Sequence, residues 1–157
     1  MKTKKCLSLG FAALVAASLS IAPAHAKTDF GVRAGSYTES DDPFFGAEAL
    51  FRVGDSKQWY GNPNLEHAFA NGNSNDLTTV SFDFHYDFPT GRPVAMWAGA
   101  GPTMILRDRN SNLDRTDPGV NLLFGIGAKQ GDVRPYGQMK VVMANDSEAV
   151  VGVGVRF

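Results

Sequence analysis

The sequence predicts an all-β protein, an eight-stranded antiparallel up-and-down β-barrel, and three observations carry this prediction. Segments of roughly ten residues with an apolar–polar period of two alternate with turn-rich clusters along most of the chain. Tight turns alternate with connections that are longer on average, which is how the two rims of such a barrel differ. The segment Val150–Phe157 alternates strictly and ends on an aromatic residue, as expected of a closing strand.

Each predicted strand is close to the roughly 9–11 residues that a tilted strand needs to cross a bilayer. The predicted strands are 28–38, 44–53, 58–69, 77–88, 94–106, 119–129, 134–144 and 148–157. Tight turns are expected at 54–57, 89–93 and 130–133, and longer polar loops at 39–43, 70–76, 107–118 and 145–147. An even number of strands returns both ends of the barrel to the rim of tight turns.

The N-terminal segment has the pattern of a cleavable, helical signal peptide. Lys2, Lys4 and Lys5 form a basic start, an apolar run follows, and small residues lead to a predicted cleavage after Ala26. The apolar run is too short to be a membrane-spanning helix. The chain is therefore divided into a signal peptide, residues 1–26, and a transmembrane β-barrel domain, residues 27–157.

The composition of the barrel domain excludes several classes of function. Cys6, the single cysteine, lies in the leader, so no disulfide can stabilise the mature protein. Without the three leader lysines, 12 of the 15 basic residues remain against 16 acidic ones, a net charge of about −4. Nucleic-acid binding, which requires a basic patch, is not expected. No metal or cofactor is expected either.

Glycine placement predicts which face of the sheet points into the barrel. A soluble barrel turns its apolar face inward, whereas a transmembrane barrel turns it outward. Gly31 shares a face with Arg33, and Gly152 and Gly154 share a face with Arg156. A solvent-facing surface does not need such small residues, but a narrow interior must fit long charged side chains beside one another. The polar face is therefore predicted to point inward.

The inward face is predicted to hold charges that neutralise one another and fill the lumen instead of lining a conducting path. This lumen network comprises Arg33, Glu48, Arg52, Glu66, Asp83, His85, Lys129, Lys140 and Arg156. The lipid-facing set comprises Val80, Phe82, Phe84, Val151, Val153 and Val155.

Aromatic residues near the strand ends are predicted to form girdles at the two membrane interfaces. The girdle at the tight-turn rim comprises Phe30, Phe51, Trp59, Tyr60, Phe88, Trp97, Tyr136 and Phe157, and the girdle at the other rim comprises Phe44, Phe45 and Phe69.

The closing strand carries a family resemblance. Gly152, Val155 and Phe157 match the membrane-insertion signal of bacterial outer-membrane barrels. This sequence departs from the signal at one position, where Val150 stands in place of the expected polar residue. With the leader, the alternation and the loop asymmetry, the chain resembles the small eight-stranded outer-membrane β-barrel superfamily of OmpA/OmpX type. Segments 62–66, 84–88 and 97–101 resemble uncharacterised β-barrel domain proteins. The resemblance implies a monomer in the outer membrane, inserted by the barrel-assembly machinery, in contact with membrane lipids and lipopolysaccharide.

Two patterns could carry chemistry. Ser81, Asp83 and His85 share one face, but residues two apart on a strand lie roughly 6–7 Å apart at the backbone, which is poor for direct Ser–His pairing. The spacing of the Asp and Asn residues at 108–114 mimics half of a calcium-binding loop, but Leu113 and Gly119 replace its glycine and its final acidic residue. A solvated surface loop is the simpler interpretation.

The sequence therefore favours a non-enzymatic outer-membrane barrel with a filled polar lumen and a structural, envelope or surface-interaction role. One alternative is a soluble periplasmic, lipocalin-like barrel that binds a small apolar ligand. A second alternative is an outer-membrane lipid-modifying enzyme.

Overall fold

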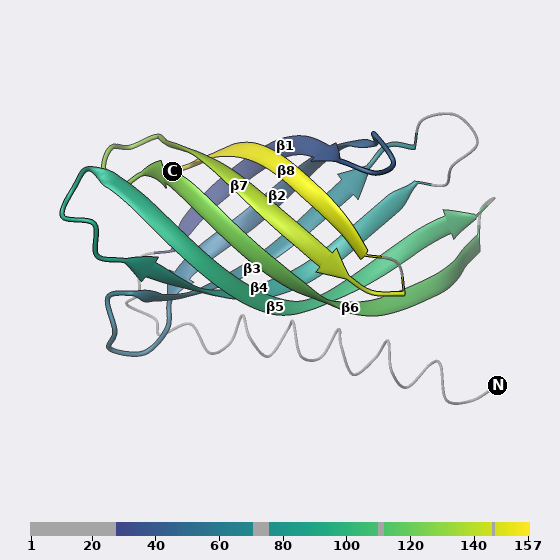
Figure 1. The fold of residues 1–157 in the computed structure, drawn as a ribbon, viewed down its shortest axis with the longest axis horizontal. Helices are drawn as coiled ribbons and strands as arrows, with labels where there is room; N and C mark the ends of the chain where they lie inside the picture. The colour runs from purple at the N-terminus through teal and green to yellow at the C-terminus, as the bar shows by residue number, and fades with distance from the viewer. Residues whose placement is uncertain (1–27, 71–75, 110–111, 146) are drawn as a thin grey trace.

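The computed structural model describes residues 28–70, 76–109, 112–145 and 147–157, so the predicted signal peptide lies outside the described residues. Eight strands form a closed barrel in which each strand pairs with its neighbour in sequence and β1 pairs with β8 (Figure 1). Every pair is antiparallel. The predicted all-β, eight-stranded up-and-down barrel is confirmed. Within the described ranges, no helix is long and apolar enough to cross a membrane.

The strands differ from the predicted ones mainly in one hairpin. They are β1 (Asp29–Tyr37), β2 (Pro43–Arg52), β3 (Trp59–Ala68), β4 (Leu77–Phe88), β5 (Val94–Arg109), β6 (Asn112–Ala128), β7 (Arg134–Met143) and β8 (Ser147–Arg156). β5 and β6 continue as a paired ladder through most of the loop predicted at 107–118. In this region the two strands pair their backbone N–H and C=O groups with each other. Backbone pairing alone therefore extends the hairpin beyond the part of the sequence that alternates between apolar and polar residues. Asn110 of the calcium-like pattern lies outside the described residues.

The turns at one rim are tight because glycine permits a left-handed backbone. Gly54 and Gly91 have φ values of 64° and 61° in the β2–β3 and β4–β5 turns. A residue with a Cβ rarely adopts this conformation without strain. The three tight turns, the start of β1 and the end of β8 meet at this rim, which we call the tight-turn rim.

The register places glycines opposite the long charged side chains of the interior. Arg33 of β1 lies opposite Gly46 of β2 and Gly154 of β8. Gly31 of β1 lies opposite both Glu48 of β2 and Arg156 of β8. A second side chain at the glycine positions would compete for the same narrow interior. The pairing therefore explains why glycines accompany charges along these strands.

The interior is layered along the barrel axis, and its end layers are apolar rather than polar. An apolar layer closes the lumen near the long-loop rim, formed by Tyr37, Phe44, Ala68, Leu77, Ile105, Val142 and Val150. A second layer toward the tight-turn rim consists of Trp97, Leu123 and Tyr136. The charged side chains lie between these two layers.

This layering corrects part of the predicted girdles. Phe44, Trp97 and Tyr136 point into the barrel and are buried, and Tyr60 lines the interior at the tight-turn rim. Trp97 fits inside because it lies opposite Gly125 of β6, where its ring occupies the space that a side chain would need. Proximity to a strand end therefore does not distinguish an interfacial aromatic residue from an interior one.

The outer face of the barrel is apolar and exposed. Val153 is 67% exposed, and Phe84 and Val151 are also exposed, while Val80 and Val155 are partly so. Phe82 lies on the same outer face by strand alternation but is only 8% exposed. Its ring centroid lies 4.8 Å from that of Phe84 and 6.2 Å from that of Phe51.

Replacing Gly125 with alanine should lower the free energy of unfolding by roughly 2 kcal/mol through overpacking against Trp97. The added Cβ would lie 2.2 Å from Cε2 of the Trp97 ring. The matched control is G137A, because the nearest atom to a Cβ at Gly137 is 4.0 Å away. Urea unfolding in detergent micelles measures both. Equal stabilities of the two variants would contradict the close packing of the Trp97 ring against Gly125.

Candidate functional site: the barrel interior

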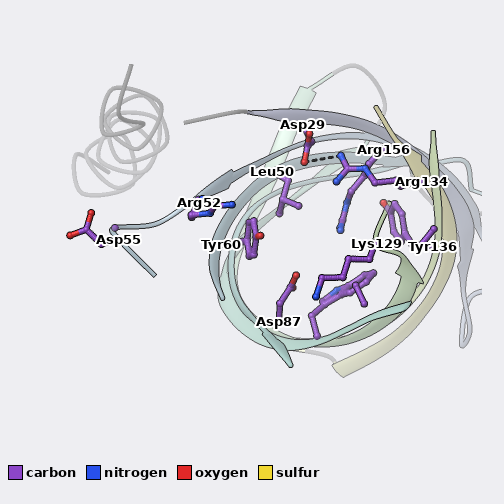
Figure 2. A pocket seen from close by; sticks show the side chains of 14 residues that line it. Asp29, Leu50, Arg52, Asp55, Tyr60, Asp87, Lys129, Arg134, Tyr136 and Arg156 are labelled. Atoms are coloured by element: carbon purple, nitrogen blue, oxygen red, sulfur yellow. Dashed lines mark ion pairs between the residues drawn. The ribbon is translucent and has the colours of Figure 1, made fainter. Parts of the chain in front are cut away.

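The interior opens at the tight-turn rim into a cavity of about 700 Å³ (Figure 2). Most of its lining comes from the first three or last three residues of strands, which the barrel gathers around one opening. The lining residues are Asp29, Leu50, Arg52, Gly54, Asp55, Tyr60, Asp87, Ala95, Trp97, Ala128, Lys129, Arg134, Tyr136 and Arg156. We call this space the vestibule.

The inner end of the vestibule is an aromatic floor that holds a guanidinium. Cζ of Arg156 lies 4.3 Å from the centroid of the Tyr136 ring and 4.8 Å from that of Trp97. These distances are within the range of cation–π attraction. His85 lies between Tyr60 and Trp97, with ring centroids 5.5 and 5.8 Å from theirs. Rings from four strands therefore separate the vestibule from the charges behind it.

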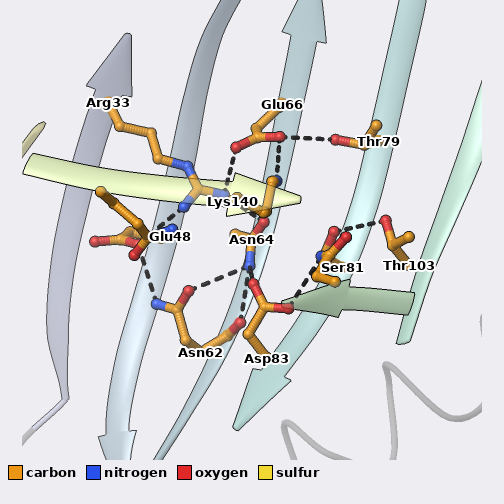
Figure 3. Close-up of polar contacts among 12 residues, drawn as sticks. Arg33, Glu48, Asn62, Asn64, Glu66, Thr79, Ser81, Asp83, Thr103 and Lys140 are labelled. Atoms are coloured by element: carbon orange, nitrogen blue, oxygen red, sulfur yellow. Dashed lines mark hydrogen bonds and ion pairs between the residues drawn. The ribbon is translucent and has the colours of Figure 1, made fainter. Parts of the chain in front are cut away.

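Behind this floor, Arg156 begins a chain of ion pairs of alternating sign. Its Nε donates to Oε1 of Glu48 at 2.7 Å. Oε2 of Glu48 lies 3.6 Å from Nη1 of Arg33, and Nη2 of Arg33 lies 2.7 Å from Oε1 of Glu66. Nζ of Lys140 donates to Oε2 of Glu66 at 2.6 Å. The chain joins five strands across the lumen, and Figure 3 shows its part from Glu48 through Arg33 and Glu66 to Lys140.

Neutral polar groups add hydrogen bonds to three of these charges, Arg33, Glu48 and Glu66. Thr79 and Tyr37 donate hydroxyl hydrogen bonds to Oε2 of Glu66 at 3.0 and 3.3 Å. Nδ2 of Asn62 donates to Oε2 of Glu48 at 3.1 Å, and Arg33 donates to the side-chain oxygen of Asn64. Buried charges need such partners because they have lost their contacts with water.

Asp83 is held by amides. Nδ2 of Asn64 donates to Oδ2 of Asp83 at 2.9 Å, and Nδ2 of Asn121 donates to Oδ1 at 3.0 Å. Between the two apolar layers, the buried charges are then three cations, Arg33, Lys140 and Arg156, and three carboxylates, Glu48, Glu66 and Asp83. We call these six residues the lumen cluster. Its formal charges cancel, which limits the cost of burying them.

The structure brings six of the nine predicted network residues together in the lumen cluster. His85 is buried in the interior, but it stacks in the aromatic floor, and its Nε2 lies 3.4 Å from Oδ1 of Asp87. Arg52 and Lys129 do not join the cluster: both are exposed and line the vestibule. They share the inward face, but β2 ends at Arg52 and β6 ends just before Lys129, so both side chains lie at the rim.

Sequence reasoning missed the neutral members of the interior. Asn62, Asn64, Thr79, Thr103 and Asn121 are all buried. Each occupies an inward position of its strand, so the same alternation that identified the charges could have identified them.

The side chains of Ser81, Asp83 and His85 contact other residues and form no hydrogen bond with one another. The Ser81 hydroxyl lies 2.8 Å from the Thr103 hydroxyl, and Asp83 is bonded to two asparagine amides. A Ser–His–carboxylate relay requires hydrogen bonds in sequence between its members. Among the described residues, Ser81 and Asp83 are hydrogen-bonded to other groups, and Nε2 of His85 lies 3.4 Å from Oδ1 of Asp87. Nor does any group of three or more His, Asp or Glu in the described chain have the geometry of a metal site.

Comparisons with known structures agree with this architecture. The N-terminal β-barrel domain of OprF from Pseudomonas aeruginosa superimposes with a TM-score of 0.63 at 15% identity, covering 83% of this chain and 95% of that one. Neisserial surface protein A gives 0.61 at 17% identity, with 82% and 92% covered. A de novo designed transmembrane β-barrel gives 0.51 at 10%, with 83% and 94% covered. No family model matches the sequence, and comparison with curated proteins finds no match.

The fold is therefore that of the small outer-membrane β-barrels, as the resemblance in the sequence implied.

Replacing Glu66 with leucine should lower the free energy of unfolding by about 3–5 kcal/mol, because Lys140 would stay buried without its carboxylate. The same variant should still show no large, stable conductance in planar bilayers, since the apolar layer near the long-loop rim remains.

The control for this change is E148L. Glu148 accepts a hydrogen bond from exposed Ser40 at the long-loop rim, at 2.8 Å. Its loss should change stability little. A stable conductance of E66L, or an unfolding free energy equal to that of E148L, would contradict the role given to the lumen cluster.

Proposed function

We propose that this protein is a bacterial outer-membrane protein whose barrel spans the membrane with a closed lumen. The observation that carries the proposal is the inverted polarity of the barrel. Arg33 is 3% exposed inside the barrel, whereas Val153 is 67% exposed outside it. In lipid, a closed barrel satisfies its own backbone hydrogen bonds, and an apolar outer face meets the hydrocarbon. In water, the same outer face would be a large unfavourable apolar surface.

The interior weighs against the first alternative, a soluble barrel with a small apolar ligand. Such a barrel needs an apolar cavity at its centre. The centre here is filled by the lumen cluster, and the cavity at the rim is lined by charged and aromatic residues.

The role that fits a closed lumen is structural or adhesive. The interior is occupied by side chains, which leaves the outer rim and its loops to meet partners at the cell surface. The second alternative, a lipid-modifying enzyme, lacks support from Ser81 and His85, whose contacts do not form a relay. We therefore propose a non-enzymatic monomer that contacts outer-membrane lipids and lipopolysaccharide.

Insertion is proposed to depend on Gly152, Val155 and Phe157 as the signal read by the barrel-assembly machinery. Phe157 is 58% exposed at the tight-turn rim. Phe30 is its natural control, because it is 56% exposed and the two residues share a pair of backbone hydrogen bonds at 3.0 and 2.8 Å.

Fractionation of the native cell should recover the protein in the outer membrane, where it migrates faster on gels before heating than after. F157A should lower the amount of this folded form roughly tenfold, whereas F30A should lower it little. A wild-type protein released with the soluble periplasmic fraction would contradict the proposed location. Equal losses in F157A and F30A would show that Phe157 acts only as a rim aromatic residue.

A further inference from the structure

The vestibule contains a buried cation with unused hydrogen-bonding capacity. Arg156 is 7% exposed, and only its Nε is bonded to Glu48. Its Nη2 is buried and has no hydrogen-bond partner within the described chain. A buried donor without a partner is costly, and such groups in native structures call for an explanation. Arg156 lines the vestibule floor, so a ligand there could accept this hydrogen bond.

Two further cations line the same cavity without ion-pair partners. Arg134 is neutralised by Asp29, with Nη2 and Oδ2 2.7 Å apart. Arg52 and Lys129, in contrast, form no ion pair with any described residue. Figure 2 shows Lys129 extending within the ring of strands.

The vestibule has one acidic side chain fewer than it has basic ones. Asp29 is already paired with Arg134. Asp55 lines the cavity from the β2–β3 turn. Oδ1 of Asp87 lies 3.4 Å from Nε2 of His85. The residues that line the cavity therefore include four basic side chains, Arg52, Lys129, Arg134 and Arg156, and three acidic ones.

We propose that the vestibule binds a small anion that carries carboxylate or phosphate groups. The guanidinium of Arg156 would donate through Nη2 at the floor, and Arg52 and Lys129 would contact the anion nearer the mouth. Guanidinium groups bind both kinds of anion through charge-assisted hydrogen bonds. The cavity of about 700 Å³ falls within the usual size of small-ligand sites. This inference goes beyond the proposed envelope role and requires only that the barrel is folded.

The test uses the protein's own tryptophan as the reporter. The chain contains two tryptophans, Trp59 on the outer face and Trp97 in the vestibule floor. In a W59F background, Trp97 alone reports changes near Arg156. The purified barrel in non-ionic micelles is titrated with citrate and, separately, with inorganic phosphate at constant ionic strength. Calorimetry of the same samples detects binding that leaves fluorescence unchanged.

Saturable binding of at least one probe is expected, and the probe that binds more tightly identifies carboxylate or phosphate as the preferred group. The R52Q/K129Q variant should raise the dissociation constant roughly tenfold, since two cations that contact the anion are lost. The matched control is K57Q/R92Q, which removes one Lys and one Arg from exposed turns of the same rim that do not line the vestibule.

Two results would overturn the proposal. One is the absence of saturable binding of both probes by fluorescence and by calorimetry. The other is an equal weakening in the two double variants, which would mean general attraction to a basic rim. All four substituted residues, Arg52, Lys57, Arg92 and Lys129, are exposed, so both double variants are expected to fold. The heat-dependent shift on gels verifies that each variant is folded.

Discussion

The structure depends on the mutual neutralisation of charges inside a narrow barrel. Lys140, Glu66, Arg33, Glu48 and Arg156 alternate in sign across the lumen, so each charge has an opposite neighbour. Removing one partner would leave a buried charge uncompensated, which costs far more than an intact pair contributes. The cluster is also large, and it fits because Gly31, Gly46 and Gly154 stand opposite its members. Electrostatic and steric constraints therefore select the same pattern of charges and glycines.

The polarity of the whole molecule follows from this interior. Because the charges occupy the centre, the apolar residues of each strand alternate to the outside, where they suit lipid. The two apolar interior layers then isolate the charges, one formed around Tyr37 and Phe44 and the other around Trp97 and Tyr136. We propose that a lumen closed in this way does not conduct. What remains accessible is the rim of loops on one side and the vestibule on the other, and these are the surfaces where binding is proposed.

Much of the architecture was predictable because strand alternation and turn chemistry are local. The eight strands and the direction of the polar face followed from the period of two and from the glycines beside Arg33 and Arg156. Depth along the axis is not local, because it depends on the register between strands. For this reason the sequence predicts Arg52 and Lys129 in the lumen network, although they lie at the rim. Trp97 was misplaced for a related reason: its strand is small on both faces, and only the pairing with Gly125 reveals the space that its ring fills.

The most direct test of the inverted barrel compares its two tryptophans in lipid. The protein is reconstituted into vesicles whose lipids carry bromine at a series of acyl-chain positions, and single-tryptophan variants W97F and W59F are compared. Trp59, 47% exposed on the outer face, should be quenched by bromine near the interface, whereas Trp97, 2% exposed inside, should not be quenched at any depth. Quenching of Trp97 as strong as that of Trp59 would contradict a charged interior enclosed by an apolar, lipid-facing wall.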